Sequence, residues 1–177
     1  GIMTVKDLQF ELFITQDQIN KRVEQLARSL KKDYNGKTPT FLIILNGAFM
    51  FASDLMKYYQ GQCKVSFMRL ASYRGTRSTG KINNYLDAEQ LENEDIIIIE
   101  DIVDTGNSIE YIIQHLKTKK LKSYRIASLF YKPDAYKKSY SIDYIGFEIP
   151  DKFILGYGLD YNGLGRNLPD IYQLKTN

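Results

Sequence analysis

The sequence predicts an α/β protein in which a parallel sheet is flanked by helices. Three observations point to this class. Residues 96–99 are four consecutive isoleucines, a run typical of a strand buried on both faces of a parallel sheet. Residues 40–45 read T-F-L-I-I-L and form a second buried strand candidate. Each run is followed by a short turn and then by a helical pattern, the alternation expected of parallel strands joined by helices.

Length and composition fit one soluble domain. A chain of 177 residues can bury a sizeable core, and its 44% hydrophobic and 25% charged residues are ordinary for a globular protein. A net charge of +3 suits anionic small molecules and does not require nucleic acid, so we expect no nucleic-acid partner. No apolar run approaches the roughly 20 residues of a membrane span. The single cysteine, Cys63, fits a reducing compartment, and we expect a cytoplasmic protein without membrane contact.

The remaining elements follow from periodicity. A helix is predicted over residues 15–36, because Thr15 and Gln18 form a capping-box pattern and apolar residues recur at 19, 23, 26 and 30. Gly36 is a suitable C-terminal stop. Further helices are expected from about 48 to 59 and over 107–117, and further strands over 64–70, 82–87 and 124–131.

Three acids end the isoleucine strand. Glu100 and Asp101 follow it directly, and Asp104 comes three residues later. Ligands of open α/β sheets bind at the carboxyl ends of the strands, where such acids suit sugar hydroxyls, Mg²⁺ or a proton. The alternative is an ordinary loop with solubilising acids.

A predicted phosphate loop, T-G-N-S, comes next. A helix N-terminus offers unpaired N–H groups and a partial positive charge, both of which bind phosphate. Gly106 lets the backbone approach an anion closely, Thr105 and Ser108 add hydroxyl donors, and Asn107 contributes its backbone N–H. The segment lacks the G-x-x-x-x-G-K-[ST] pattern of nucleotide-binding P-loops and the G-x-G-x-x-G pattern of dinucleotide-binding folds.

Residues 100–108 resemble the phosphoribosyl-diphosphate (PRPP) signature of the type I phosphoribosyltransferases, in which two acids precede a D-T-G-x-[ST] loop. The resemblance implies a parallel sheet flanked by helices with a small hood built from the chain ends. Residues 1–177 would then form one phosphoribosyltransferase domain, with a core over about 35–145 and a hood from about 1–14 and 146–177.

The resemblance also assigns roles around PRPP. Glu100 and Asp101 would hold the ribose hydroxyls and, through water, Mg²⁺. Asp104 would accept the proton from purine N7 as general base, and residues 105–108 would bind the 5′-phosphate.

Residues 143–166 resemble the base-recognition segment of the hypoxanthine-guanine phosphoribosyltransferases, through G-F-E-I-P-D-K-F, G-Y-x-L-D-Y-N and an arginine four residues after the asparagine. By that resemblance Phe153 would stack on the purine and the backbone of Ile154 would read the ring edge. Lys132, at the end of a predicted strand, would donate to the oxygen at C6. Asp160 is assigned to the purine site and would also help to carry a second Mg²⁺ on the diphosphate. Arg166 would bind oxygens of the diphosphate.

Two further segments match the family. Leu45, Asn46 and Gly47 resemble a Leu-x-Gly segment that binds diphosphate through backbone N–H groups, often with a cis peptide. Asn46 stands where the vertebrate-like pattern has lysine. Residues 71–81 resemble the flexible catalytic loop, with Ser72 and Tyr73 as its Ser-Tyr pair. We expect this loop to close as a lid over a charged substrate, and the alternative is a hairpin tip that stays in solvent.

The implied function is purine salvage: hypoxanthine or guanine and PRPP, with Mg²⁺, are converted to IMP or GMP and diphosphate. A homodimer or homotetramer is the family expectation. One alternative is a regulator that senses PRPP or a nucleotide with the same loop, although such regulators usually carry a separate nucleic-acid-binding domain. Another is a phosphoribosyltransferase for a different purine, such as xanthine or adenine.

Overall fold

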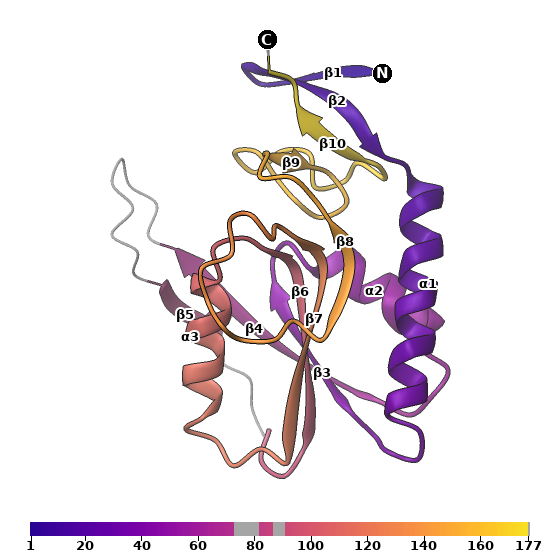
Figure 1. Cartoon of the computed structure of the whole chain (residues 1–177), viewed down its shortest axis with the longest axis vertical. Coiled ribbons are helices and arrows are strands. Elements are labelled where there is room, and N and C mark those ends of the chain that lie inside the picture. The colour runs from indigo at the N-terminus through magenta and orange to yellow at the C-terminus, as the bar shows by residue number, and fades with distance from the viewer. Residues whose placement is uncertain (73–81, 87–90, 177) are drawn as a thin grey trace.

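The computed structural model describes residues 1–72, 82–86 and 91–176 and divides their strands between two sheets (Figure 1). The main sheet has the strand order β5-β4-β3-β6-β7-β8. Its five strands from β4 to β8 in this order run parallel, and β5 pairs antiparallel with β4 at the edge. The strands span Thr40–Leu45 (β3), Lys64–Ser72 (β4), Ile82–Leu86 (β5), Asp95–Val103 (β6), Ser123–Tyr131 (β7) and Tyr144–Glu148 (β8). The α/β prediction is confirmed, and β5 adds an antiparallel edge.

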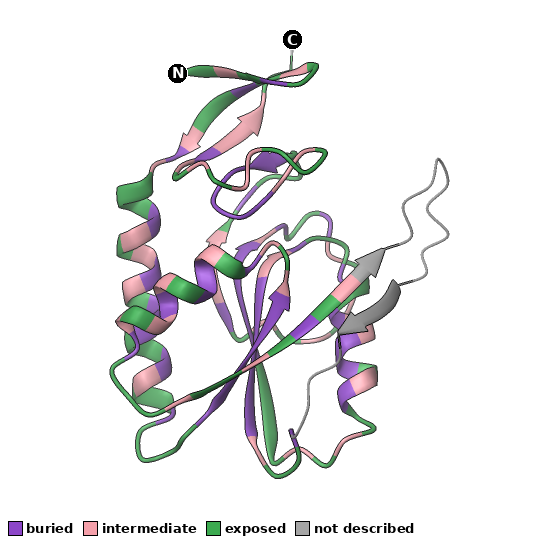
Figure 2. Ribbon diagram, turned by 180° about the vertical axis from the view of Figure 1, so that it is seen from behind, coloured by how far each residue is buried: buried purple, intermediate pink, exposed green. Residues whose placement is uncertain are grey.

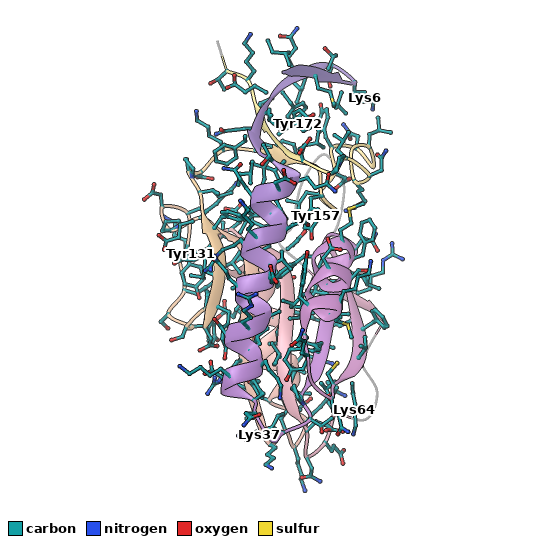
Figure 3. All side chains as sticks on the ribbon, turned by 90° about the vertical axis from the view of Figure 1, so that its right-hand side faces the viewer. Lys6, Lys37, Lys64, Tyr131, Tyr157 and Tyr172 are labelled. Carbon is teal, nitrogen blue, oxygen red and sulfur yellow. The ribbon has the colours of Figure 1, made fainter. Side chains whose placement is uncertain are left out.

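Strand β6 lies in the middle of the sheet, as its isoleucines predicted. All four, at 96–99, have 0% exposure. The odd-numbered pair packs with helices α1 (Gln16–Asp33) and α2 (Phe49–Tyr58), and the even-numbered pair packs with α3 (Asn107–Leu116). Figure 2 shows buried residues running along these central strands, and Figure 3 shows α1 and α2 on one face of the sheet. Burying one such side chain contributes about 1.5–3 kcal/mol, which fixes this strand firmly.

Helix α1 begins as expected and ends early. The Gln18 side chain accepts from the Thr15 N–H at 2.9 Å, and the Gln18 N–H donates back to Thr15 Oγ1 at 3.3 Å, which completes the capping box. The helix ends at Asp33, because Tyr34 leaves the helical conformation with φ −109 while its N–H still bonds to Leu30. The prediction of a helix to residue 36 is therefore wrong at its C-terminal end.

The second sheet comes from the two chain ends. Its antiparallel strands are β1 (Ile2–Val5), β2 (Leu8–Ile14), β9 (Ile154–Leu155) and β10 (Ile171–Leu174), in the order β1-β2-β10-β9. Figure 1 shows it above the main sheet, with both termini at its outer end. This is the hood that the resemblance implied. Strand β8 stays in the main sheet as far as Glu148, so the C-terminal part of the hood follows it.

Tyr157 joins the loops of the hood to the core. Its hydroxyl donates to Asp54 of α2 at 2.6 Å, and Figure 3 shows it between the hood and that helix.

Among the described residues no helix is long and apolar enough to cross a membrane.

Candidate active site

A cavity of about 380 Å³ lies where the carboxyl ends of β3, β6 and β7 face the hood. It gathers residues from stretches that are far apart in the chain. The predicted site residues that line it are Leu45, Asn46, Gly47, Glu100, Asp101, Asp104, Thr105, Gly106, Asn107, Ser108, Lys132, Phe153, Ile154, Asp160 and Arg166. Ser72 ends strand β4, and Tyr73 lies outside the described residues, so the lid stays a prediction.

The phosphate loop connects β6 to α3 with a backbone that requires glycine. Gly106 has φ +95, in the left-handed region, and helix α3 begins at the next residue. A Cβ on Gly106 would lie 2.6 Å from both Tyr136 and Lys138, which pack against the outside of the loop. The Thr105 hydroxyl accepts from the Asn107 N–H at 3.4 Å. Tyr136 and Lys138 therefore pack on the side of the loop at Gly106, and the polar residues of the loop line the cavity.

The turn after β3 packs directly on the acids. The peptide between Leu45 and Asn46 is cis, as the family resemblance implied. A Cβ on Gly47 would lie 1.8 Å from the Asp101 carboxylate, and a Cβ on Gly158 would lie 2.3 Å from the Gly47 carbonyl oxygen. Two glycines thus allow this turn to fit between β6 and the C-terminal segment, which places its backbone beside the acids.

Glu100 and Asp101 lie within β6, which continues to Val103 and does not stop before these acids as predicted, and both have raised pKa values. Burial and the neighbouring Asp101 raise the pKa of Glu100 well above its usual range. Burial also raises the pKa of Asp101 to about 6, although the Ile102 N–H and Arg166 oppose the shift. The Ile102 N–H donates to Asp101 Oδ1 at 2.7 Å. A bound cation or hydroxyl donor would stabilise both carboxylates, because an opposite charge or a donated hydrogen bond favours the ionised form of a carboxyl group.

The carboxylates fit a magnesium ion that is shared with a substrate. In the part of the chain that the structure describes, no group of three or more His, Cys, Asp or Glu residues could hold a metal unaided. Mg²⁺ commonly uses one or two carboxylates, several waters and substrate phosphates. Glu100, Asp101 and Asp160 all line the cavity, and their carboxylate oxygens would be suitable ligands for such an ion.

Asp160 and Arg166 form a second polar cluster on the C-terminal segment. Arg166 Nη2 lies 3.2 Å from Asp160 Oδ1, and its Nη1 donates to the Gly158 carbonyl at 2.6 Å. The Gly163 N–H donates to the other Asp160 oxygen at 2.7 Å. Both charged residues also influence the pKa of Asp101. Asp160 therefore lies beside Arg166 and close enough to Asp101 to affect its pKa, and both predicted roles of Asp160 stay predictions.

The aromatic side of the cavity is built from both ends of the chain. Phe153 is 41% exposed, and its ring lies 6.1 Å from that of Phe10 and 5.9 Å from that of Tyr161. The Tyr161 hydroxyl donates to Asp7 in the β1–β2 turn at 2.6 Å. Sequence reasoning missed Phe10, Tyr161 and Asp7. The alternation in L-Q-F-E-L could have indicated a strand with Phe10 on its buried face.

Lys132 is buried beside two acids. Its backbone N–H donates to Val103 at 3.0 Å, and only 6% of the residue is exposed. Its ammonium lies 3.4 Å from Asp104 Oδ2 and 3.5 Å from Asp151 Oδ1. The predicted general base and the predicted purine donor are thus in contact, and Asp151 is a neighbour that sequence reasoning did not identify.

Known proteins resemble this chain along most of its length. The family model for the phosphoribosyl transferase domain matches residues 15–162. The hypoxanthine-guanine phosphoribosyltransferases of Staphylococcus aureus (strain Mu50 / ATCC 700699) and Bacillus subtilis (strain 168) are 41% and 37% identical to the chain, each over 93% of both sequences. The crystal structure of a hypoxanthine phosphoribosyltransferase from Staphylococcus aureus superposes with a TM-score of 0.87 at 41% identity, covering 93% of this chain and 91% of that one.

Proposed function

Since the chain belongs to the phosphoribosyl transferase domain family, we propose that it is a purine salvage enzyme that uses hypoxanthine or guanine. It transfers the 5-phosphoribosyl group from PRPP to the purine and gives IMP or GMP plus diphosphate. One observation carries the proposal: a single cavity holds a phosphate-type loop, the buried Glu100 beside the half-buried Asp101, a buried lysine and an exposed aromatic ring. The names of its relatives support the same activity.

The reaction requires placement and proton removal more than covalent work by the protein. The bond between ribose C1 and diphosphate breaks with its electron pair on the diphosphate, and a purine ring nitrogen bonds to C1. The N7 proton passes to the Asp104 carboxylate, which lines the cavity at 49% side-chain exposure and can therefore reach a bound purine.

The phosphate side binds PRPP. The hydroxyls of Thr105 and Ser108 and the N–H groups at the start of α3 hold the 5′-phosphate. The turn at residues 45–47 and Arg166 hold the diphosphate. Glu100 and Asp101 bind the ribose hydroxyls and would hold one Mg²⁺ through water, and Asp160 would help to hold a second Mg²⁺ on the diphosphate. When bound, Mg²⁺ neutralises the charge of the diphosphate.

The purine side selects the base. Lys132 donates to the oxygen at C6. Adenine has an amino group at this position, and an amino group does not accept a hydrogen bond from an ammonium. Phe153 stacks on the ring with its exposed face. The backbone of Ile154 reads the edge around N1 and the 2-position. A lysine and a carboxylate in this arrangement serve a reacting base, which favours an enzyme over a regulator that only senses PRPP or a nucleotide.

The whole chain, 1–177, acts as one domain in this proposal, with its core at the main sheet and its hood from the two chain ends. We further propose a homodimer or homotetramer. Val65 and Phe67 on β4 are 39% and 45% exposed. They pair in register with the buried Phe41 and Ile43 of β3, and they leave apolar surface at the side of the sheet.

The single cysteine, Cys63, supports a reducing, cytoplasmic setting.

A purine panel tests the proposed function. The protein is mixed with PRPP, Mg²⁺ and hypoxanthine, guanine, xanthine or adenine, and nucleotide formation is followed by ultraviolet absorbance. Hypoxanthine and guanine should turn over, and adenine should not. Turnover of xanthine alone would move the specificity to that purine, and PRPP binding without turnover of any base would favour the regulator.

A further inference from the structure

The Lys132 ammonium is held by two carboxylates at once. It lies 3.4 Å from Asp104 and 3.5 Å from Asp151. Charge-assisted hydrogen bonds between nitrogen and oxygen are usually about 2.7–2.9 Å long. Both contacts are longer than that, so the ammonium lies between the acids and is tightly bound to neither. The lysine side chain is 7% exposed, whereas those of Asp104 and Asp151 are 49% and 58% exposed.

Three adjacent strands fix this arrangement. Asp104 follows β6, Lys132 follows β7 and Asp151 follows β8. Backbone hydrogen bonds continue past the strand ends, from the Lys132 N–H to Val103 at 3.0 Å and from the Ile149 N–H to Tyr131 at 2.9 Å. These bonds hold the ends of the three strands in register, close to the three side chains.

We propose that Asp151 is a positioning residue for the purine-binding step, because it holds the Lys132 ammonium away from a tight pairing with Asp104. This inference rests on the proposed function. When a 6-oxopurine enters, Lys132 turns to the purine oxygen and keeps Asp151 as its counter-charge. Asp104 is then released to accept the N7 proton.

Burial of the lysine makes the second acid necessary. A buried cation is costly unless it is paired, so Lys132 needs a carboxylate at every stage. With Asp104 as its remaining neighbour, the ammonium would move into closer contact with that carboxylate. The oxygen that should receive the proton would then be occupied, and the donor that should bind the purine oxygen would be withdrawn from it. Asp151 prevents both effects without contacting the reacting atoms.

Asp151→Asn tests the proposal with its shape preserved. We expect kcat/KM for hypoxanthine to fall about tenfold, and KM for PRPP to stay within about twofold of the wild type. Asp134→Asn is the matched control, because Asp134 is an exposed acid two residues after Lys132, and it should leave both constants within about twofold. Asp151→Glu, which restores the charge, should recover most of the loss.

A double-mutant cycle with Lys132→Met separates positioning from a general surface effect. If Asp151 acts through the lysine, adding Asp151→Asn to Lys132→Met should change kcat/KM for hypoxanthine by less than about twofold. An equal loss in both backgrounds, or no loss in the Asp151→Asn single variant, would overturn the proposal. Neither result would contradict the proposed function. That function is contradicted only if the wild-type protein forms no nucleotide from hypoxanthine and PRPP.

Discussion

The two sides of the cavity are built in different ways. On the phosphate side, the two acids and the phosphate loop come from one continuous segment, residues 100–108, which runs from the last part of β6 to the start of α3. The purine side combines Lys132 after β7 with a three-ring cluster of Phe10, Phe153 and Tyr161 from both chain ends. The phosphate loop is therefore a local structure on the central strand of the main sheet, whereas the purine side forms only when distant parts of the chain meet.

Their supports also differ in size. Beneath the phosphate loop, the clusters around β6 include residues of all three helices. The buried cluster within the hood contains only Val5, Phe10 and Leu155 among the described residues. Changes on the purine side should consequently alter base binding while the main sheet stays intact, and changes in the phosphate loop should alter PRPP binding selectively.

Asp104→Asn should have the largest effect on turnover. The substitution preserves the shape of the side chain and removes the proton acceptor, which lies where the two sides of the cavity meet. Because general-base catalysis contributes roughly 10²–10⁴-fold, kcat should fall by about that factor while PRPP affinity is kept. Steady-state kinetics and PRPP binding check this. Near-wild-type turnover would remove Asp104 from the mechanism.

Lys132→Ala should affect the purine side alone. It removes a charge-assisted hydrogen bond to the purine oxygen, worth about 1.5–3 kcal/mol. KM for hypoxanthine should rise roughly 10- to 150-fold at saturating PRPP, since each 1.4 kcal/mol is about tenfold. The measurement is a pair of KM values, one for each substrate. Loss of PRPP affinity with an unchanged hypoxanthine KM would contradict the assignment.

Gly106→Ala should damage the phosphate side through its backbone. The left-handed φ of +95 costs a non-glycine residue about 1–2 kcal/mol, and the new methyl would also clash with Tyr136 and Lys138. Gly36→Ala is the control, since its φ is +78 with nothing within 4 Å of the Cβ position. Both variants should unfold at lower denaturant concentration, but only Gly106→Ala should lose PRPP affinity. Equal PRPP affinity in the two variants would contradict the proposal that the phosphate loop binds PRPP.

Tyr161→Phe should have the smallest effect. It keeps the ring beside Phe153 and removes only the hydrogen bond to Asp7, an interaction that also lowers the pKa of that acid. Since an exposed polar pair contributes little, KM for hypoxanthine should rise by no more than about twofold. Tyr161→Ala, which removes the ring, should raise it further. Identical kinetics for the two variants would show that the ring does not support Phe153.

The parts that the sequence predicted are those with local causes. The isoleucines at 96–99 indicated a doubly buried strand because no exposed strand could carry four in a row, and the Thr15 capping box placed the start of α1. The sequence also placed Glu100 and Asp101 directly after these isoleucines, although β6 does not end there and continues to Val103. Each conclusion needed only residues within about one helical turn or strand of one another.

The parts that it missed depend on contacts between distant segments. Nothing near Asp151 indicates that its carboxylate lies beside Lys132, because strand pairing between β7 and β8 brings them together. Phe10 supports Phe153 only through the pairing of β2 with β10 and of β10 with β9. The end of α1 was placed too late because Gly36 was taken as the stop, whereas Tyr34 already leaves the helix.

The most direct measurement compares Ser108→Ala with Phe153→Leu for both substrates. Ser108→Ala removes one hydroxyl from the phosphate loop, and it should raise KM for PRPP about tenfold while leaving KM for hypoxanthine within about twofold at saturating PRPP. Phe153→Leu should do the reverse, raising only KM for hypoxanthine, by roughly three- to tenfold. If each variant instead changed both constants equally, the cavity would not bind phosphoribosyl on one side and purine on the other.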